Sequence, residues 1–296
     1  MSPVGVGTWA WGDTLYWQYK DEDEKDAQEA FTASVDAGIN FFDTAEIYGS
    51  GRSEKLCGQF ARGYSGSGSD EIQVATKFMP LPNRFLNGRE AVGAALRDSL
   101  ERLGTDSCDL YQLHWPSFIW DSEFWDGLAD AYEAGLVRSV GVSNYSAKRM
   151  RAAHKALEAR GVPLAVNQVQ YSLLDRSPEY NEVLSTCEEL GVKVLAYSPL
   201  AQGWLTGKYG GKNKPSGPRG MQGREEPRAL LDAMRRIGGE WDKTPSQVAL
   251  NWVMCKGAIP IPGARNAKQA RENAGAMGWR LSHEQVAELD RLTKSA

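Results

Sequence analysis

The sequence has few of the residues that build metal centres, disulfide frameworks or nucleic-acid surfaces. Its four cysteines are far apart and form no CxxC pair, and its three histidines form no metal-ligand cluster with them. The formal net charge of −4 gives no overall attraction to phosphate backbones. These shortages argue against a metal centre and against nucleic acid as a partner, and they favour reduced, buried thiols.

Long apolar stretches, the pattern of a secretory leader and the glycine motif of a Rossmann fold are also missing. No apolar run approaches the roughly 18 residues that span a bilayer, and no basic-then-apolar leader precedes the first apolar run at Val4–Thr8. The turn at Gly5–Gly12 places its third glycine two positions late for the GxGxxG fingerprint of a Rossmann fold. We therefore expect a soluble protein with no membrane partner and without that dinucleotide-binding motif.

What the sequence does contain is a regular alternation of short apolar runs and longer stretches of helical period, which is typical of parallel βαβ units. The apolar runs are Val4–Thr8, Ile39–Thr44, Ile72–Lys77, Asp109–His114, Ser139–Asn144, Ala165–Gln170, Val192–Ser198 and Ala258–Gly263. Helical period marks Glu24–Ala37, Arg89–Leu103, Phe124–Ala134, Ala147–Ala159, Asn181–Leu190, Ala229–Trp241, Pro245–Met254 and Asn266–Met277. Left-handed C-caps are expected at Gly38, Gly104, Gly135, Gly161 and Gly191. About eight strand–helix units predict a single (β/α)₈ TIM barrel domain, residues 1–296, with an open doubly wound sheet as the runner-up.

Polar side chains stand at the carboxyl ends of six of these runs. They are Asp43, Lys77, His114, Asn144, Gln168 and Ser198. In a barrel the loops after the strands build the active site on one face, so these side chains should converge. Their origin in different strands favours a functional site over simple strand termination.

These runs carry a family resemblance. The stretches Asn40–Gly49, Ala75–Lys77, Asp109–His114 and Gly141–Tyr145 resemble those of the aldo-keto reductases. The similarity continues in order through Asn167–Tyr171, Ala196–Leu200, Leu205–Tyr209, Ile259–Arg265 and Glu272–Asn273. The first loop, Trp9–Asp13, and the stretch Leu113–Pro116 are most similar to a branch common in plants, algae and photosynthetic bacteria, related to channel β-subunit-like reductases. The resemblance therefore implies the cytoplasm or the chloroplast stroma.

The resemblance implies NADPH-dependent reduction of aldehydes and ketones to alcohols by a tetrad of Asp43, Tyr48, Lys77 and His114. A tyrosine phenol, with a pKa of about 10, is a poor acid at neutral pH, and an adjacent ammonium lowers that pKa by stabilising the phenolate. Lys77 would supply this charge and Asp43 would hold Lys77 protonated. His114 would orient the substrate carbonyl, so Tyr48 is the expected proton donor.

The resemblance also implies an extended site for NADPH or NADP⁺. Ser143, Asn144 and Gln168 would bind the nicotinamide carboxamide, and Tyr197 would stack under the ring. Further contacts are expected from Thr8, Trp9, Ser198, Pro199, Leu200, Gln202, Lys208, Gly263, Gln269, Glu272 and Asn273, although Glu272 and Asn273 could also be a solvated helix face. Arg265, aided by Lys208 and Arg219, would bind the 2′-phosphate, because these cations have no evident acidic partner in the sequence. NADPH should therefore be preferred over NADH.

Aromatic residues gather in the two loops next to the tetrad. They are Trp9, Trp11, Tyr16 and Trp17 in the first loop, and Trp115, Phe118 and Trp120 after His114. Such rings could wall a pocket for a small apolar or aromatic carbonyl substrate. The alternative is that several of them close the barrel top on each other.

Two other functions compete with reduction. The family includes channel-associated β subunits, so the chain could be an NADP(H)-binding regulatory subunit with little turnover, but the presence of His114 favours an enzyme. A metal-dependent barrel hydrolase would need a multi-histidine or histidine–carboxylate ligand set, which the sequence lacks. The sequence indicates no particular oligomeric state.

Overall fold

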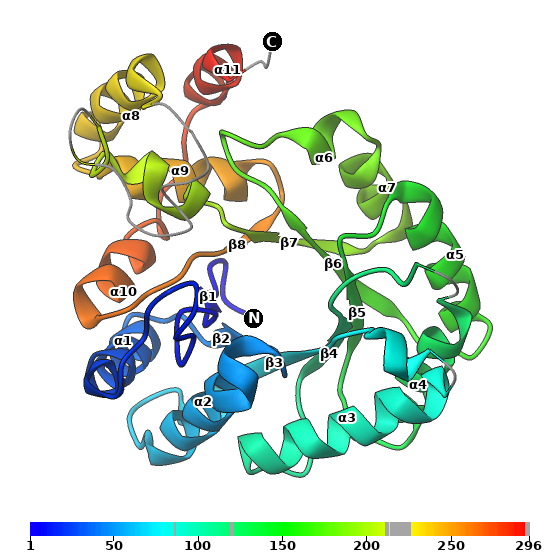
Figure 1. Cartoon of the computed structure of the whole chain (residues 1–296). Coiled ribbons are helices and arrows are strands. Elements are labelled where there is room, and N and C mark those ends of the chain that lie inside the picture. Colours follow the sequence, from blue (N-terminus) through cyan, green and yellow to red (C-terminus); the bar gives the residue numbers. More distant parts are fainter. Residues whose placement is uncertain (86, 119–120, 211–212, 214–225, 294–296) are drawn as a thin grey trace.

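Eight parallel strands form a barrel surrounded by helices (Figure 1). The computed structural model describes residues 1–85, 87–118, 121–210, 213 and 226–293. The strands are β1 (Val6–Gly7), β2 (Phe41–Asp43), β3 (Gln73–Phe78), β4 (Leu110–Leu113), β5 (Val140–Ser143), β6 (Leu164–Gln170), β7 (Lys193–Tyr197) and β8 (Ile259–Ile261). The helices are α1 (Glu24–Asp36), α2 (Arg52–Gly63), α3 (Gly88–Leu103), α4 (Ser122–Glu133), α5 (Ala147–Glu158), α6 (Ser177–Tyr180), α7 (Val183–Leu190), α8 (Arg228–Gly239), α9 (Pro245–Cys255), α10 (Ala267–Ala274) and α11 (His283–Leu292). The predicted (β/α)₈ class and all eight predicted strands are confirmed.

The strands are hydrogen-bonded in sequence order, because each βαβ unit adds one parallel strand beside the last. This order leaves β1 and β8 at the two ends of the sheet, and backbone hydrogen bonds join them. The amide of Gly5 donates to the carbonyl oxygen of Pro260. The amide of Gly7 donates to that of Pro262, and a Cβ on Gly7 would lie only 2.9 Å from the carbonyl oxygen of Ile261. The ends therefore meet, and the alternative of an open doubly wound sheet is wrong.

The apolar core has two layers, one on each face of the strands. A small layer fills the barrel interior with Phe41, Ala75, Leu110, Val166, Leu195 and Ile261. The larger layer lies between strands and helices, where Phe31 of α1 stacks on Phe42 with ring centroids 4.3 Å apart. Phe41 and Phe42 are consecutive and belong to different layers, as the period-two alternation of a strand requires.

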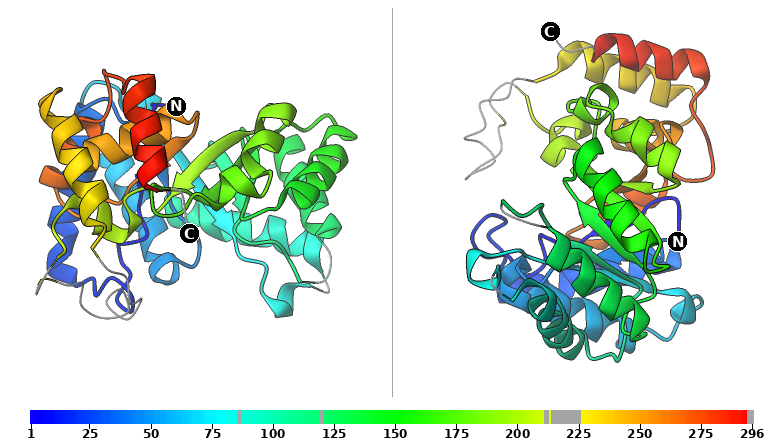
Figure 2. Two further views of the ribbon diagram at one scale, coloured as in Figure 1. Left: turned by 90° about the horizontal axis from the view of Figure 1, so that it is seen from above. Right: turned by 90° about the vertical axis from the view of Figure 1, so that its right-hand side faces the viewer.

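Glycine residues end five of the predicted helices as expected. Gly38, Gly104, Gly135, Gly161 and Gly191 have φ values of 85°, 67°, 71°, 71° and 68°. The sequence pattern predicts no helix at the positions of α2, α6 and α11. The last of these packs beside α8 on the outside of the molecule (Figure 2).

Within the described ranges, no helix combines the length and the apolar character that crossing a membrane would require. The cysteines are free thiols, three of them buried and Cys255 half-buried. The same ranges contain no group of three or more His, Cys, Asp or Glu side chains placed to hold a metal ion.

Candidate active site

A polar layer lies at the carboxyl end of the barrel, two positions along the strands from the apolar interior layer. It consists of Asp43, Lys77, Gln112 and Gln168, which follow Phe41, Ala75, Leu110 and Val166 in β2, β3, β4 and β6. Side chains two apart on a strand share a face, so these four point into the barrel. All four are buried, Lys77 completely. A charge buried to this extent needs a partner.

The ammonium of Lys77 has that partner. Its Nζ donates to Asp43 Oδ2 at 2.5 Å and to the carbonyl oxygen of Thr44 at 2.7 Å. Burial lowers the pKa of Lys77, but Asp43 and Tyr48 outweigh burial and the net pKa is raised. Lys77 is therefore a stable cation beneath the mouth of the barrel.

Two side-chain amides hold the other oxygen of Asp43. Its Oδ1 accepts from Gln112 Nε2 at 3.1 Å and from Gln168 Nε2 at 2.9 Å, and Gln168 Nε2 also lies 3.2 Å from Gln112 Oε1. Gln112 is not among the site residues predicted from the sequence. The sequence feature that could have identified Gln112 is its position as a polar residue inside an apolar run, on the same strand face as His114 two positions later.

Tyr48 begins the short helix η2 (Tyr48–Gly51), in the loop that follows β2. Its hydroxyl accepts a 3.4 Å hydrogen bond from Lys77 Nζ, which lies 4.8 Å from the centre of the Tyr48 ring. Burial raises the pKa of Tyr48, Lys77 lowers it and Asp43 raises it, and the net direction is upward. The lowering by the ammonium that the sequence predicts is present, but burial is the larger influence on the pKa of Tyr48. The phenol is thus protonated at neutral pH.

His114 follows β4 and faces Tyr48 edge-on, with ring centroids 5.5 Å apart and an interplanar angle of 81°. The side chain is 8% exposed, and its Nδ1 has no hydrogen-bond partner in the part of the chain that the structure describes. Burial, reinforced by the charge of Lys77, lowers the pKa of His114 to about 3. The imidazole is therefore neutral and can donate one N–H to an oxygen placed between it and Tyr48.

A cluster of hydroxyl groups supports the end of β2. Thr8 Oγ1 donates to the carbonyl oxygen of Asp43 at 3.0 Å and lies 2.8 Å from Ser53 Oγ. Ser53 Oγ also accepts from Thr44 Oγ1 at 2.8 Å. The side chain of Thr8 is fully buried, and its hydroxyl fixes the backbone of Asp43. A contact of Thr8 with the cofactor stays a prediction.

The residues expected at the nicotinamide meet at the ends of β5, β6 and β7. Ser143 Oγ donates to the carbonyl oxygen of Gln168 at 2.8 Å, and Asn144 Nδ2 donates to Ser143 Oγ at 3.0 Å. The Tyr197 hydroxyl donates to Asn144 Oδ1 at 3.0 Å. Asn144 and Tyr197 are partly exposed, whereas the buried Gln168 amide is bound to Asp43.

The loop after β7 has an unusual backbone. Ser198, Ala201 and Gln202 have φ values of 51°, 47° and 55°, a conformation that costs non-glycine residues on the order of 1–3 kcal/mol and clusters at ligand sites. The hydroxyl of Tyr16, from the first loop, donates to Gln202 Oε1 at 2.7 Å. Of the other residues expected here, Pro199 is buried, Leu200 is partly buried, and Lys208 is exposed with its ammonium 4.8 Å from the Tyr209 ring centre.

Arg265 precedes α10, whose N-cap is Asn266. Asn266 Oδ1 accepts from the Gln269 amide at 3.0 Å, and Gln269 Oε1 accepts from the Arg265 amide at 2.9 Å. The expectation that Arg265 lacks an acidic partner is wrong. Its Nη2 lies 3.6 Å from Asp23 Oδ2, because the fold packs α1 and the segment before it beside α10.

The remaining residues expected at the adenosine end also have partners in the protein. Asn273 Nδ2 donates to the carbonyl oxygen of Gly263 at 3.2 Å. Glu272 Oε1 accepts from Thr244 Oγ1 at 3.0 Å. Asn273 is buried and Glu272 is half-buried, so the alternative of a solvated helix face does not describe Asn273.

The first loop packs aromatic rings around Tyr48. Trp9 stacks on Tyr16 at 4.8 Å between centroids and lies 6.1 Å from the Tyr48 ring, and Trp17 meets Trp9 edge-on at 5.6 Å. Trp9 and Trp17 remain partly exposed. The rings therefore both pack on each other and border the tetrad.

Trp11 does not belong to this group. It is 1% exposed, its indole N–H donates to the carbonyl oxygen of Ala264 at 2.8 Å, and its ring packs edge-on against Phe60 at 5.8 Å. Trp11 as a wall of a substrate pocket is therefore wrong, because its side chain enters the core between strands and helices. Trp115 and Phe118 are 45% and 94% exposed. Trp120 and Arg219 lie outside the described residues.

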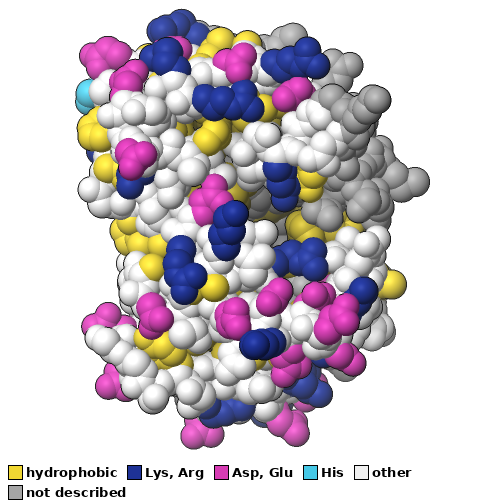
Figure 3. Space-filling view, turned by 90° about the vertical axis from the view of Figure 1, so that its left-hand side faces the viewer, with side chains coloured by type: hydrophobic (Ala, Val, Ile, Leu, Met, Phe, Trp, Pro, Cys, Tyr) yellow, Lys and Arg dark blue, Asp and Glu magenta, His cyan; other side chains and the backbone are white. Residues whose placement is uncertain are grey.

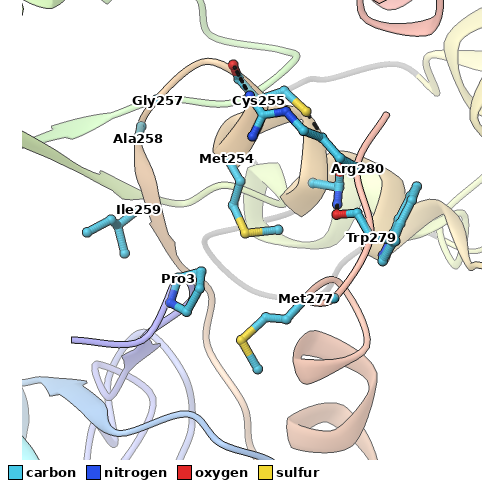
Figure 4. Close-up of a pocket in the computed structure, with 11 residues that line it drawn as sticks. Pro3, Met254, Cys255, Gly257, Ala258, Ile259, Met277, Trp279 and Arg280 are labelled. Carbon is cyan, nitrogen blue, oxygen red and sulfur yellow. Dashed lines mark hydrogen bonds between the residues drawn. The ribbon is translucent and has the colours of Figure 1, made fainter. Parts of the chain in front are cut away.

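A separate hollow of about 310 Å³ lies at the opposite end of β8 (Figure 4). Ile259, the first residue of that strand, faces it together with Pro3, Met254 and Met277. The tetrad residues stand at or after the carboxyl ends of their strands. The hollow is therefore not part of the candidate active site.

The fold and the site together define a (β/α)₈ barrel enzyme. A phenol, an ammonium and a neutral imidazole meet on the carboxyl face of its barrel. The chain matches the Aldo/keto reductase family over residues 3–294. It belongs to this family and is an oxidoreductase.

Two relatives known by sequence extend this result. The chain is 42% identical over 312 residues to the chloroplastic pyridoxal reductase of Arabidopsis thaliana, an alignment that covers 100% of this chain and 84% of the relative. It is 32% identical over 296 residues to the NADP⁺-linked aldo-keto reductase yakc of Schizosaccharomyces pombe, covering 93% of this chain and 84% of that protein.

Two solved structures agree with the fold. An aldo/keto reductase from Klebsiella pneumoniae, in complex with NADP and acetate, superposes with a TM-score of 0.79 at 30% identity, covering 99% of this chain and 92% of that one. The glycerol dehydrogenase of Gluconobacter oxydans gives a TM-score of 0.85 at 27% identity, with 99% and 91% coverage.

Proposed function

We propose that this protein reduces aldehydes and ketones to alcohols with NADPH, and that residues 1–296 act as one catalytic domain. The observation that carries the proposal is the fully buried Lys77, placed between Asp43 and the hydroxyl of Tyr48. A barrel needs no buried ammonium for stability, because burying an ion pair generally costs as much as it returns. The pair is therefore better explained by chemistry at Tyr48.

The residues present fit a bound dinucleotide. Tyr197 offers a partly exposed ring and Asn144 a partly exposed amide at the ends of β7 and β5. Arg265 and the amides at the start of α10 offer a guanidinium and backbone donors for a phosphate. NADPH, when bound there, supplies a hydride to the carbonyl carbon.

Tyr48 then gives its proton to the carbonyl oxygen. The upward shift of the pKa of Tyr48 keeps the phenol protonated until the reaction, and the 3.4 Å contact with Lys77 stabilises the phenolate that remains. Asp43 holds Lys77 in its charged form. The neutral His114 donates a hydrogen bond to the same oxygen, so charge that develops on it is met from two sides.

The proposed substrates are apolar or aromatic carbonyl compounds. Trp9 borders Tyr48 from the first loop and packs edge-on against Trp17, and the partly exposed Trp115 follows His114, so we expect aromatic rings at the mouth of the site. Stacking on such rings favours a flat aromatic aldehyde over a small polar one. Pyridoxal, on which the Arabidopsis relative acts by its name, is the first compound to try.

The cofactor preference rests on Arg265. Its guanidinium, close to the start of α10, can bind the 2′-phosphate that distinguishes NADPH from NADH. The proposed compartment is the cytoplasm or the chloroplast stroma, the latter because the Arabidopsis relative is chloroplastic.

NADPH oxidation, followed by absorbance with pyridoxal, an apolar aromatic aldehyde and a small polar aldehyde, tests the proposal. We expect turnover that is highest for the aromatic compounds. Tyr48→Phe should keep less than a few per cent of it while binding NADPH as tightly as the wild type, since only the transferable proton is lost. Tight NADPH binding without turnover of any carbonyl would instead support a regulatory NADP(H)-binding subunit.

A further inference from the structure

The segment before α1 presents one carboxylate to Arg265. Asp23 ends the short helix η1 (Asp21–Asp23), and its Oδ2 lies 3.6 Å from Arg265 Nη2. The same oxygen accepts a 2.9 Å hydrogen bond from the amide of Lys20. This bond fixes the carboxylate in position, so its approach to Arg265 is built into the turn rather than left to a free side chain.

The other acidic residues of this segment face different cations. Asp21 Oδ1 accepts from Arg52 Nη1 at 2.6 Å, and Glu24 Oε2 lies 3.6 Å from Arg52 Nη2. Glu22 pairs with Lys20 at 3.1 Å. On the face of the molecule that α1 and α10 share, acidic and basic side chains alternate in this way (Figure 3). Asp23 is thus distinguished from its neighbours by its partner.

We infer that Asp23 is a specificity-determining residue that competes with the 2′-phosphate of NADPH for Arg265. The inference rests on the proposed function, in which Arg265 binds that phosphate. A phosphate that binds the guanidinium competes with the carboxylate for its charge, and it carries its own charge close to that of Asp23. Both effects weaken NADPH binding and leave a nucleotide without a 2′-phosphate unaffected.

The position of Asp23 next to Arg265 also allows the opposite effect, in which the carboxylate favours NADH, and experiment can distinguish the two. In dinucleotide-binding folds, a carboxylate near the adenosine ribose accepts a hydrogen bond from the 2′-hydroxyl and thereby favours NADH. If Asp23 did this, its removal would weaken binding of NADH and ADP. The position of Arg265 favours competition, because its guanidinium lies next to this carboxylate as an ion-pair partner.

Asp23→Asn tests the inference with little disturbance, because the asparagine oxygen can still accept from the amide of Lys20. Glu22→Gln is the matched control. It removes the same charge from the residue next to Asp23, whose side chain pairs with Lys20. The probes are 2′,5′-ADP and ADP, which differ only in the phosphate at the 2′ position, together with NADPH and NADH. Calorimetric titration at low salt measures each affinity, and thermal unfolding checks that each variant is folded.

We expect Asp23→Asn to bind 2′,5′-ADP and NADPH about two- to fivefold more tightly, the range of a partly exposed ion pair. ADP and NADH should bind as before, and Glu22→Gln should match the wild type. In an Arg265→Ala background, Asp23→Asn should give a smaller gain, because no guanidinium remains for the carboxylate and the phosphate to compete for. If the wild type binds NADPH but Asp23→Asn leaves the affinity for 2′,5′-ADP unchanged, the role of Asp23 is overturned and the proposed function is not. Weaker binding of ADP or NADH would also overturn it, and a wild type that binds no nucleotide would overturn the proposed function with it.

Discussion

Lys77 is a full charge in a place that water does not reach, and several neighbours depend on it. Asp43 and the carbonyl oxygen of Thr44 bind its ammonium, and the Tyr48 hydroxyl lies within hydrogen-bond distance. Removing the ammonium therefore has two separable effects. The phenol loses the charge that stabilises its conjugate base, and the buried carboxylate loses its counter-ion.

Lys77→Met should lower kcat by about 100-fold or more, because positioned acid–base groups contribute on the order of 10²–10⁴-fold to a rate. It should also lower the free energy of unfolding by about 1–3 kcal/mol, since Asp43 keeps its two glutamine donors but loses the cation. Turnover with NADPH and urea unfolding measure these effects. Lys193→Met, at the exposed start of β7, is the matched control and should change neither. A Lys77→Met enzyme with a tenth of wild-type activity would remove Lys77 from the mechanism.

His114 makes stability depend on pH in a direction that can be worked out. The pKa of His114 is about 3 in the folded protein and about 6.5 in an unfolded chain. Below pH 6.5 the unfolded chain binds a proton that the folded chain does not, so the stability present above this pH falls as the pH decreases toward 3. Between pH 7 and 5 the wild type should lose about 2 kcal/mol more than His114→Asn. Urea unfolding of both proteins at pH 7 and pH 5 measures the difference, and equal losses would contradict a neutral, buried imidazole.

At the scale of residues, the sequence predicts which side chains meet in the tetrad, but it does not predict the long-range contacts that site residues make with the rest of the protein. Asp43, Tyr48, Lys77 and His114 are found from motif and strand position, both of which are local. The Asp23–Arg265 pair joins opposite ends of the chain, and no local pattern records it. Trp11 was misplaced for a related reason, since the direction of a ring in a loop depends on the core that it meets.

At the scale of elements, a buried ion pair ties α2 to α3. Glu54 of α2 is fully buried, accepts from Arg102 Nε of α3 at 2.6 Å and is also bound by the hydroxyl of Thr76 in β3. Arg102 Nη2 donates to Ser99 Oγ at 3.0 Å. Because α2 follows directly on the short helix that Tyr48 begins, this pair fixes the segment that carries the proposed proton donor.

Arg102→Met should destabilise the protein by about 3–5 kcal/mol, because it leaves Glu54 as an uncompensated buried charge. Adding Glu54→Gln should recover a large part of that loss, since the remaining group is neutral. Urea unfolding of the single and double variants provides the comparison. Arg97→Met, on the exposed face of the same helix, should behave as the wild type. A double variant no more stable than Arg102→Met would show that the loss comes from packing and not from charge.

The elements themselves were largely predictable, and the exceptions have a physical explanation. Strands were found from their apolar runs, and five helix ends from glycines that adopt a left-handed conformation. Helix α2 lacks such signals, because its N-cap is Gly51 instead of a polar residue, its C-cap is Tyr64 and it contains Gly58. A Cβ on Gly58 would collide with the carbonyl oxygen of Leu103, so this glycine serves the close approach of α2 and α3.

At the scale of the whole molecule, the barrel is bonded unevenly around its ring. β6 and β7 are paired at five positions, whereas β1 and β2 are paired at two. At the junction of β1 with β8, Pro260 and Pro262 accept hydrogen bonds from β1 but have no amide hydrogen to return. This junction should open more readily than the rest of the sheet.

Hydrogen–deuterium exchange can measure that difference. The amides of Gly5 and Gly7 should exchange faster than those of Val166–Gln170 in β6, because protection reflects the free energy of local opening. Mass spectrometry of peptides covering each strand gives the comparison, with β3 and β4 as internal references of intermediate pairing. Equal protection of β1 and β6 would indicate that the barrel opens only as a unit.

The junction also sets an order of events during synthesis. A chain leaves the ribosome from its amino terminus, so β1 is made first and β8 last among the strands. The acceptors that Gly5 and Gly7 need on that side, Pro260 and Pro262, are translated only after α1–α9 have been translated. The first strand to be synthesised is therefore the last to gain its second neighbour, and completion of the ring waits for the final part of the chain.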